Sequence, residues 1–205
     1  TGFTGFKTAA AEELPDAVEV MDPFHVIQLA GDAMDRCRQR VQQETCGHRG
    51  RAGEPLYGLR RTLHTGAGLL TAKQASRIDV VLDDDWHSAV AAVWGVYQDM
   101  VAAYRREDRS GAKTAMRHVI DSLGAGVPEG LDELRTLGRT LKRRAADVLA
   151  YFDRPGTSNG PTEAINGRLE HLRGIALGFR NLTHYIARAL LESGGFRPAL
   201  HPGLR

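Results

Sequence analysis

Helical periodicity dominates this sequence and limits the folds open to it. Residues 24–44 carry apolar side chains at helical spacing, with some scatter. Further helix-like stretches follow, without a convincing strand among them, at residues 56–64, 71–82, 86–106, 111–123 and 130–152. The pattern predicts a mostly helical chain, because apolar residues that recur every three or four positions line one face of a helix.

The segment before this helical block has a different pattern. Residues 6–14 favour a helix, and residues 17–21 form a short β-rich run. Asp22-Pro23 ends that run, because proline cannot donate a hydrogen bond to a sheet. The run therefore predicts a strand with Asp22 at its C-terminal tip. A helical block does not explain such a strand, so we expect a mostly helical α/β fold whose small core is interrupted by a helical insertion.

Two segments rich in helix breakers divide the chain. Residues 46–55 are rich in glycine and arginine, and residues 153–161 contain prolines and glycines. After the second segment we expect a helix that carries Glu163 in its first turn, then a last helix over residues 183–192. The tail from residue 194 onward is predicted to be loop.

The overall charge says little about partners, but the choice of basic residue is unusual. The net charge is +2, and hydrophobic residues make up 42% of the chain, enough for a core. Four basic residues are lysine and the other 23 are arginine. Arginine binds phosphate through paired hydrogen bonds. Codon bias in a GC-rich genome explains the same excess, so both interpretations stay open.

Cysteine content and hydropathy indicate the compartment. Cys37 and Cys46 are too few for a disulfide framework, which favours a reducing cytosol. No apolar run approaches the roughly 20 residues that span a bilayer, and the N-terminus has no signal pattern. We therefore expect a cytoplasmic protein with no membrane partner.

Two carboxylates stand out by their positions. Asp22 lies at the tip of the predicted strand, where the sites of α/β folds gather, and Glu163 lies in the first turn of a helix. Each position also has an ordinary explanation. An aspartate before proline often caps a helix, and an acidic residue in a first turn often interacts with the helix dipole.

The sequence around both carboxylates is more specific than either position. Val-Met-Asp-Pro-Phe-His-Val occupies residues 20–26, and Ser-Asn-Gly-Pro-Thr-Glu-Ala-Ile-Asn occupies residues 158–166. These stretches resemble the motifs around the second aspartate and the glutamate of bacterial insertion-sequence transposases of the ISL-three family. Gly-Phe-Arg-Asn at residues 178–181 and the segment 48–57 resemble further family elements. The resemblance covers about residues 1–203, with the motifs in the family's order.

The resemblance implies a ribonuclease-H-like core and a metal-dependent reaction on DNA. A triad of two aspartates and one glutamate would hold two Mg²⁺ ions, with Mn²⁺ as a substitute, and Asp22 and Glu163 would be its catalytic, metal-binding members here. The reaction would cleave DNA at the insertion-sequence ends and join the freed 3′ hydroxyl to target DNA. The partners would be double-stranded DNA and further copies of the chain, at the bacterial nucleoid.

The resemblance also implies how the chain divides. The first part of the ribonuclease-H-like core would span residues 1–45, and a helical insertion would span residues 46–150. The second part of the core, with the glutamate helix, would span residues 151–192, and residues 193–205 would be a tail.

One position departs from the family pattern. Thr1 precedes the stretch Gly-Phe-Thr-Gly-Phe-Lys at residues 2–7, where the family's first aspartate is expected. A neutral hydroxyl does not supply the charge of a carboxylate ligand, and Asp16 lies in a turn beside Pro15, where it is a poor replacement. We therefore expect a truncated or decayed copy that is inactive, or nearly so, by itself.

Basic and polar residues near the motifs are candidates for DNA contacts. Arg168 and Arg173 follow Glu163 by about one and about three helical turns, and most protein–DNA hydrogen bonds go to phosphate and sugar. The predicted DNA-binding set is Arg168, Arg173, Arg180, Arg49 and Arg51, and the predicted supporting set is His25, Asn159 and Asn166. The ordinary alternatives are a solvated helix face for the arginines and a packed or capping role for the histidine.

Two other functions remain open at this stage. A non-catalytic DNA-binding remnant would bind through its arginines and lose affinity steeply with salt. A helical interaction module would use Asp22 and Glu163 only as helix-terminal residues.

Overall fold

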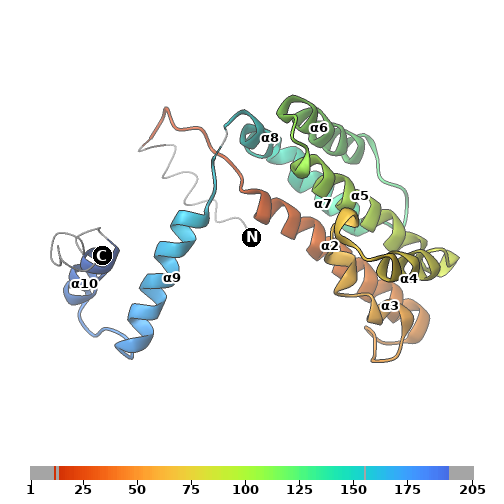
Figure 1. Ribbon diagram of the computed structural model, residues 1–205, viewed down its shortest axis with the longest axis horizontal. Helices are drawn as coiled ribbons and strands as arrows, with labels where there is room; N and C mark the ends of the chain where they lie inside the picture. Colours follow the sequence, from red (N-terminus) through yellow and green to blue (C-terminus); the bar gives the residue numbers. More distant parts are fainter. Residues whose placement is uncertain (1–11, 13, 155, 194–205) are drawn as a thin grey trace. The chain divides into compact units, whose positions relative to one another are not determined.

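The computed structural model describes residues 12, 14–154 and 156–193. The chain divides into two compact units, Thr1–Thr157 and Ser158–Arg205, and each is described by itself. The helices of the first unit are α2 (Pro23–Cys46), α3 (Pro55–Gly58), α4 (Ala72–Leu82), α5 (Ser88–Arg105), α6 (Arg109–Ala125), α7 (Asp132–Arg143) and α8 (Ala145–Asp153), with 3₁₀ turns at Thr62–His64, Ala67–Leu69 and Asp85–His87 (Figure 1). The second unit contains α9 (Gly160–Ile175) and α10 (Leu182–Ser193).

The prediction of a mostly helical chain is confirmed, but the predicted strand is not formed. Within the described ranges no strand is present, and residues 17–21 have no regular secondary structure. The Met21 amide donates to the carbonyl oxygen of Asp147 at 2.9 Å, so this backbone is held by a helix and not by a neighbouring strand. Strand formation requires a partner for the ladder, which β propensity alone does not provide. Most of the helix expected over residues 6–14, Thr1 and the tail after residue 193 lie outside the described residues.

Local signals explain where the helices begin. Oδ1 of Asp22 accepts a hydrogen bond from the Phe24 amide at 2.8 Å, and Pro23 occupies the first turn of α2. Thr71 and Gln74 form a reciprocal capping box at the start of α4. Such caps satisfy amides that the helix itself leaves without partners.

The core of the first unit is built around α2. This helix packs on α5, α7 and α8, while α6 packs on α5, α7 and α8 (Figure 1). Fully buried side chains from these helices include Met34, Met100, Met116, Leu141 and Val148. Each such burial contributes roughly 1.5–3 kcal/mol, so hydrophobic packing stabilises this unit.

Two arginines of α2 serve the fold. Nε and Nη2 of Arg40 donate to the two carboxylate oxygens of Glu133 at 2.8 and 3.0 Å, which ties α2 to α7. Burial, the largest single influence, raises the pKa of Glu133, but the hydrogen bond from Arg40, a backbone hydrogen bond and the charges of Arg40 and Arg36 together lower that pKa below its usual value. Arg38 is buried and donates from Nη1 to Oε1 of Gln42 at 2.6 Å. The arginine excess therefore includes structural residues.

The expected helix over residues 130–152 is two helices. Arg144 separates α7 from α8 with φ −107° and ψ 16°, and its amide bonds to carbonyls of the preceding turn. Neither glycine nor proline marks this break. Both helices pack on α6, and Val148 and Phe152 of α8 are buried. Packing thus overrides a local sequence that favours continuous helix.

The second unit has a different interior. Its helices α9 and α10 contact each other, yet neither contains a buried residue in the described part of the chain. Ile175, Leu182, Ile186 and Leu190 are large apolar residues that remain exposed.

The two cysteines differ in environment. Cys37 is fully buried on α2, and burial, followed by the nearby charge of Glu133, raises the pKa of its thiol to about 12. Cys46 is exposed at the end of α2. None of the described helices is long and apolar enough to cross a membrane.

Candidate functional site

Asp22 lies at the N-terminus of α2, where it caps the helix. The expected strand tip is replaced by this helix start, but the carboxylate remains only partly buried. The charge of Asp22 also acts on a residue of the core. Burial raises the pKa of Tyr104 most, and the charges of Tyr151 and then Asp22 raise it further. The hydroxyl of Tyr104 is buried without a hydrogen-bond partner in the described ranges. Asp22 thus has a structural role that does not exclude a second one.

Glu163 lies in the first turn of α9, as predicted. Its side chain is exposed, and Nδ2 of Asn159 donates to its Oε1 at 3.3 Å. Asn159 precedes the helix, so the residue expected to support Glu163 is in contact with it. Asn166 follows on the same helix and is exposed.

His25, the other predicted supporting residue, lies on α2. Its ring is exposed and meets the ring of Phe24 edge-on, with centroids 5.7 Å apart. The contact is with the neighbouring residue at the start of α2, and it leaves the His25 ring reachable from solvent.

The donor chemistry of Asp22 and Glu163 fits a hard divalent cation. Both are carboxylates, which Mg²⁺ and Mn²⁺ prefer as protein ligands. The structure describes Asp22 in the first unit and Glu163 in the second. Within the described residues, no group of three or more histidine, cysteine, aspartate or glutamate side chains is assembled for a metal. The pairing of these two carboxylates therefore stays a prediction from the sequence.

The predicted DNA-binding arginines are all exposed. Arg49 and Arg51 lie in the loop between α2 and α3, where Nε2 of His48 contacts Oε1 of Glu54 at 3.2 Å. In the second unit, Nη1 of Arg173 contacts Glu170 at 2.8 Å. Arg168 and Arg180 form no ion pair within the described ranges.

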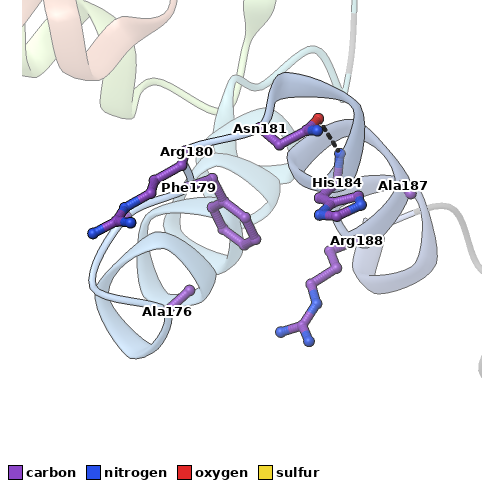
Figure 2. Close-up of a pocket in the computed structure, with 8 residues that line it drawn as sticks. Ala176, Phe179, Arg180, Asn181, His184, Ala187 and Arg188 are labelled. Carbon is purple, nitrogen blue, oxygen red and sulfur yellow. Dashed lines mark hydrogen bonds between the residues drawn. The ribbon is translucent and has the colours of Figure 1, made fainter.

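The sequence did not single out two further basic residues of the second unit. His184 and Arg188 lie four positions apart on α10, so they occupy one face of the helix. Together with Phe179, Arg180 and Asn181 they line a hollow at the turn between α9 and α10 (Figure 2). Their spacing, directly after the Gly-Phe-Arg-Asn motif, is the signal that would have identified them.

Comparison with known families agrees with the motif pair. The family model of ISL3-type DDE transposases, described as "Transposase", matches residues 2–189. The chain therefore belongs to the ISL3 family of DDE transposases, a family that uses divalent metal ions.

Two curated relatives carry the same name. Each is a "Transposase for insertion sequence element IS1557" from Mycobacterium tuberculosis, one from strain CDC 1551 / Oshkosh and one from strain ATCC 25618 / H37Rv. Each is 28% identical to this chain over an alignment 219 positions long, which covers 94% of this chain and 46% of the relative. The chain thus spans about half the length of these relatives. No solved structure is significantly similar to it.

Proposed function

We propose that this chain is part of the catalytic region of a DDE transposase and carries two of its metal-binding carboxylates. One observation carries the proposal: the family match spans both Asp22 and Glu163, and both carboxylates are accessible to a metal. Residues 1–45 and 151–192 are the parts we assign to a ribonuclease-H-like core, with residues 46–150 as its helical insertion.

Asp22 and Glu163 would hold Mg²⁺, or Mn²⁺ in its place, in the complete enzyme. When bound, two such cations stabilise the attacking and leaving oxygens of a phosphodiester. The chain's own contribution is to fix the ligands: the hydrogen bond to the Phe24 amide orients Asp22, and Asn159 orients Glu163. His25 and Asn166 are proposed to support these carboxylates.

The substrate we propose is double-stranded DNA at insertion-sequence ends and at the target. Exposed guanidinium groups are suited to phosphate, because they remain charged and donate paired hydrogen bonds. Arg49, Arg51, Arg168, Arg173 and Arg180 are proposed to position the strands, which are cleaved and then joined to target DNA. We expect the complete enzyme to act as a homo-oligomer on the bacterial chromosome.

Metal binding is the direct test of this proposal. Thr1 stands where the family's first aspartate is expected, so cleavage by this chain alone is expected to be weak or absent. Calorimetric titration with Mn²⁺ is expected to show binding that Asp22→Asn and Glu163→Gln each weaken at least tenfold, a loss of about 1.4 kcal/mol. Asparagine is as good a helix cap as aspartate, so Asp22→Asn tests the charge without removing the cap.

The matched control is Glu129→Gln, which neutralises an exposed acid before α7. Its Mn²⁺ binding is expected to equal that of the unchanged chain. Equal binding by all three variants would refute the carboxylate pair.

A non-catalytic DNA-binding remnant is the second candidate, favoured by the exposed arginines. It predicts duplex binding that weakens steeply with salt and needs no divalent metal. A helical interaction module, favoured by the capping role of Asp22, predicts neither metal nor DNA binding. Gel shifts across a salt series, with and without Mn²⁺, separate the three functions.

A further inference from the structure

The hollow at the turn between α9 and α10 has the features of a binding site. Its volume is about 670 Å³, and its polar and aromatic lining comes from Phe179, Arg180, Asn181, His184 and Arg188. Figure 2 shows Arg180 extending to one side of Phe179 and Arg188 to the other, and all of these side chains come from the second unit. A volume of this size is in the range of small-molecule sites.

The backbone of the turn is fixed by its own hydrogen bonds. The Gly178 amide donates to the Arg173 carbonyl at 2.9 Å, and the Leu177 amide donates to the Gly174 carbonyl at 3.1 Å. These bonds form a Schellman motif, in which Leu177 adopts the left-handed conformation at φ 51°. The motif ends α9 and determines where Phe179 and Arg180 leave the helix.

The charged groups of the hollow all have the same sign. Arg180 and Arg188 are cationic, and no carboxylate is among the described residues that line the space. Oδ1 of Asn181 accepts hydrogen bonds from the amides of Thr183 and His184 at 2.8 and 3.3 Å. Because these amides are already used, an anion would be recognised by the side chains. Each of the two guanidinium groups on this hollow suits a phosphate group.

Phe179 adds an aromatic surface to this anion site. It is half-buried, and its ring lies 5.2 Å from the ring of Tyr185, which helps to hold it in place. A guanidinium pair alone would suit any phosphate. An aromatic ring beside it suits a base whose face is free, because every base stacks on aromatic side chains.

We propose that this hollow binds one nucleotide of an unpaired DNA strand, with its two flanking phosphates on Arg180 and Arg188 and its base on Phe179. Bases in an intact duplex stack on each other, so only an unpaired or extruded base presents a free face. The inference rests on the proposed function, because it assigns to the DNA substrate a local single-stranded form.

Fluorescence anisotropy with labelled oligothymidylate, and with a labelled duplex, tests the proposal on the full chain. Phe179→Leu keeps an apolar side chain but removes the aromatic face. It is expected to lower the affinity for oligothymidylate about tenfold and to leave the affinity for the duplex unchanged. Phe179→Tyr is expected to bind oligothymidylate like the unchanged chain. Arg188→Ala is expected to weaken binding and to reduce the salt slope by about one unit.

The control is Arg139→Ala, which removes an exposed arginine of α7 in the first unit and is expected to bind oligothymidylate normally. Circular dichroism checks that Phe179→Leu keeps its helices. Unchanged oligothymidylate binding by Phe179→Leu, or equal losses for oligothymidylate and duplex, would overturn the proposal. Mn²⁺ titration separates the two proposals, because Phe179→Leu should retain metal binding, whereas Asp22→Asn and Glu163→Gln should retain oligothymidylate binding.

Discussion

The two units of the chain differ in how they obtain stability. In the first unit, apolar side chains from α2, α5, α6, α7 and α8 are buried together. In the second, α9 and α10 bury no described residue, and their isoleucines and leucines remain exposed. Most helical stability in proteins comes from packing an apolar face. We therefore expect the first unit to be stable by itself, because only its helices bury such faces in the described part of the chain. The predicted chemistry, in contrast, draws residues from both units.

The largest expected contrast is between two truncations of apolar side chains. Leu141→Ala removes a fully buried residue and is expected to cost about 3 kcal/mol, through lost burial and the cavity left behind. Ile186→Ala, at a residue 49% exposed, is expected to cost well under about 1 kcal/mol. Urea unfolding monitored by circular dichroism measures both. Equal costs would show that the second unit has an apolar core comparable with that of the first.

The ion pair between α2 and α7 should give the first unit a pH dependence. Glu133→Gln is expected to cost about 1–2 kcal/mol at neutral pH, because Arg40 loses the charge that it contacts. The pKa of Glu133 is lower in the folded protein, so its stabilisation is complete above the usual glutamate pKa of about 4.3 and is lost as the pH falls further. Unfolding curves of both proteins should therefore converge in acid. A difference that persists undiminished there would contradict the pair.

Truncating the residue before the first helix should cost more stability in the first unit than in the second. Asp22→Ala removes the capping hydrogen bond of α2 and is expected to cost about 1 kcal/mol. Asn159→Ala, at the start of α9, removes no such cap and is expected to cost less. Thermal unfolding compares the two variants. A larger cost for Asn159→Ala would indicate that its contact with Glu163 stabilises the second unit more than a cap stabilises the first.

Substitutions at the helix C-termini of the two units should change stability with opposite signs. Gly47 ends α2 at φ 75°, whereas Leu177 adopts φ 51° at the end of α9. Gly47→Ala is expected to destabilise the chain by roughly 1 kcal/mol, and Leu177→Gly to stabilise it by at most about that amount. Differential scanning calorimetry resolves both signs. Destabilisation by Leu177→Gly would mean that the leucine side chain makes a contribution larger than its backbone strain.

Local signals in the sequence were sufficient to predict most helices. Pro23 after Asp22 marks the start of a helix that the structure confirms, and the expected stretch over residues 71–82 corresponds to α4. The strand predicted over the β-rich run at residues 17–21 was wrong, because a strand needs a neighbouring strand, which β propensity does not specify. The break between α7 and α8 at Arg144 was missed for a related reason. It results from tertiary packing, and no glycine or proline marks it in the sequence.

The candidate site was predictable only in part. Motifs singled out Asp22, Glu163 and Asn159 as candidates because each lies within a short segment. The contact between Glu163 and Asn159 comes from the structure, and the metal-binding roles stay predictions. The burial of Arg38 and the pairing of Arg40 with Glu133 depend on packing between distant segments. The arginine content of the sequence is therefore larger than the number of arginines available to contact DNA. The hollow beside Phe179 depends on the turn after α9, whose left-handed leucine no propensity rule would suggest.

The unequal cysteines give the molecule a built-in attachment point. A thiolate is the reactive form, so the sequestered Cys37, with its raised pKa, should resist maleimide reagents, while Cys46 should accept them. A spin label could then be attached at Cys46 without first removing the other cysteine. A second label would be introduced on α9. Pulsed electron paramagnetic resonance, in buffer without Mn²⁺, would then measure the distance between α2, which Asp22 caps, and α9, which carries Glu163, before and after DNA is added.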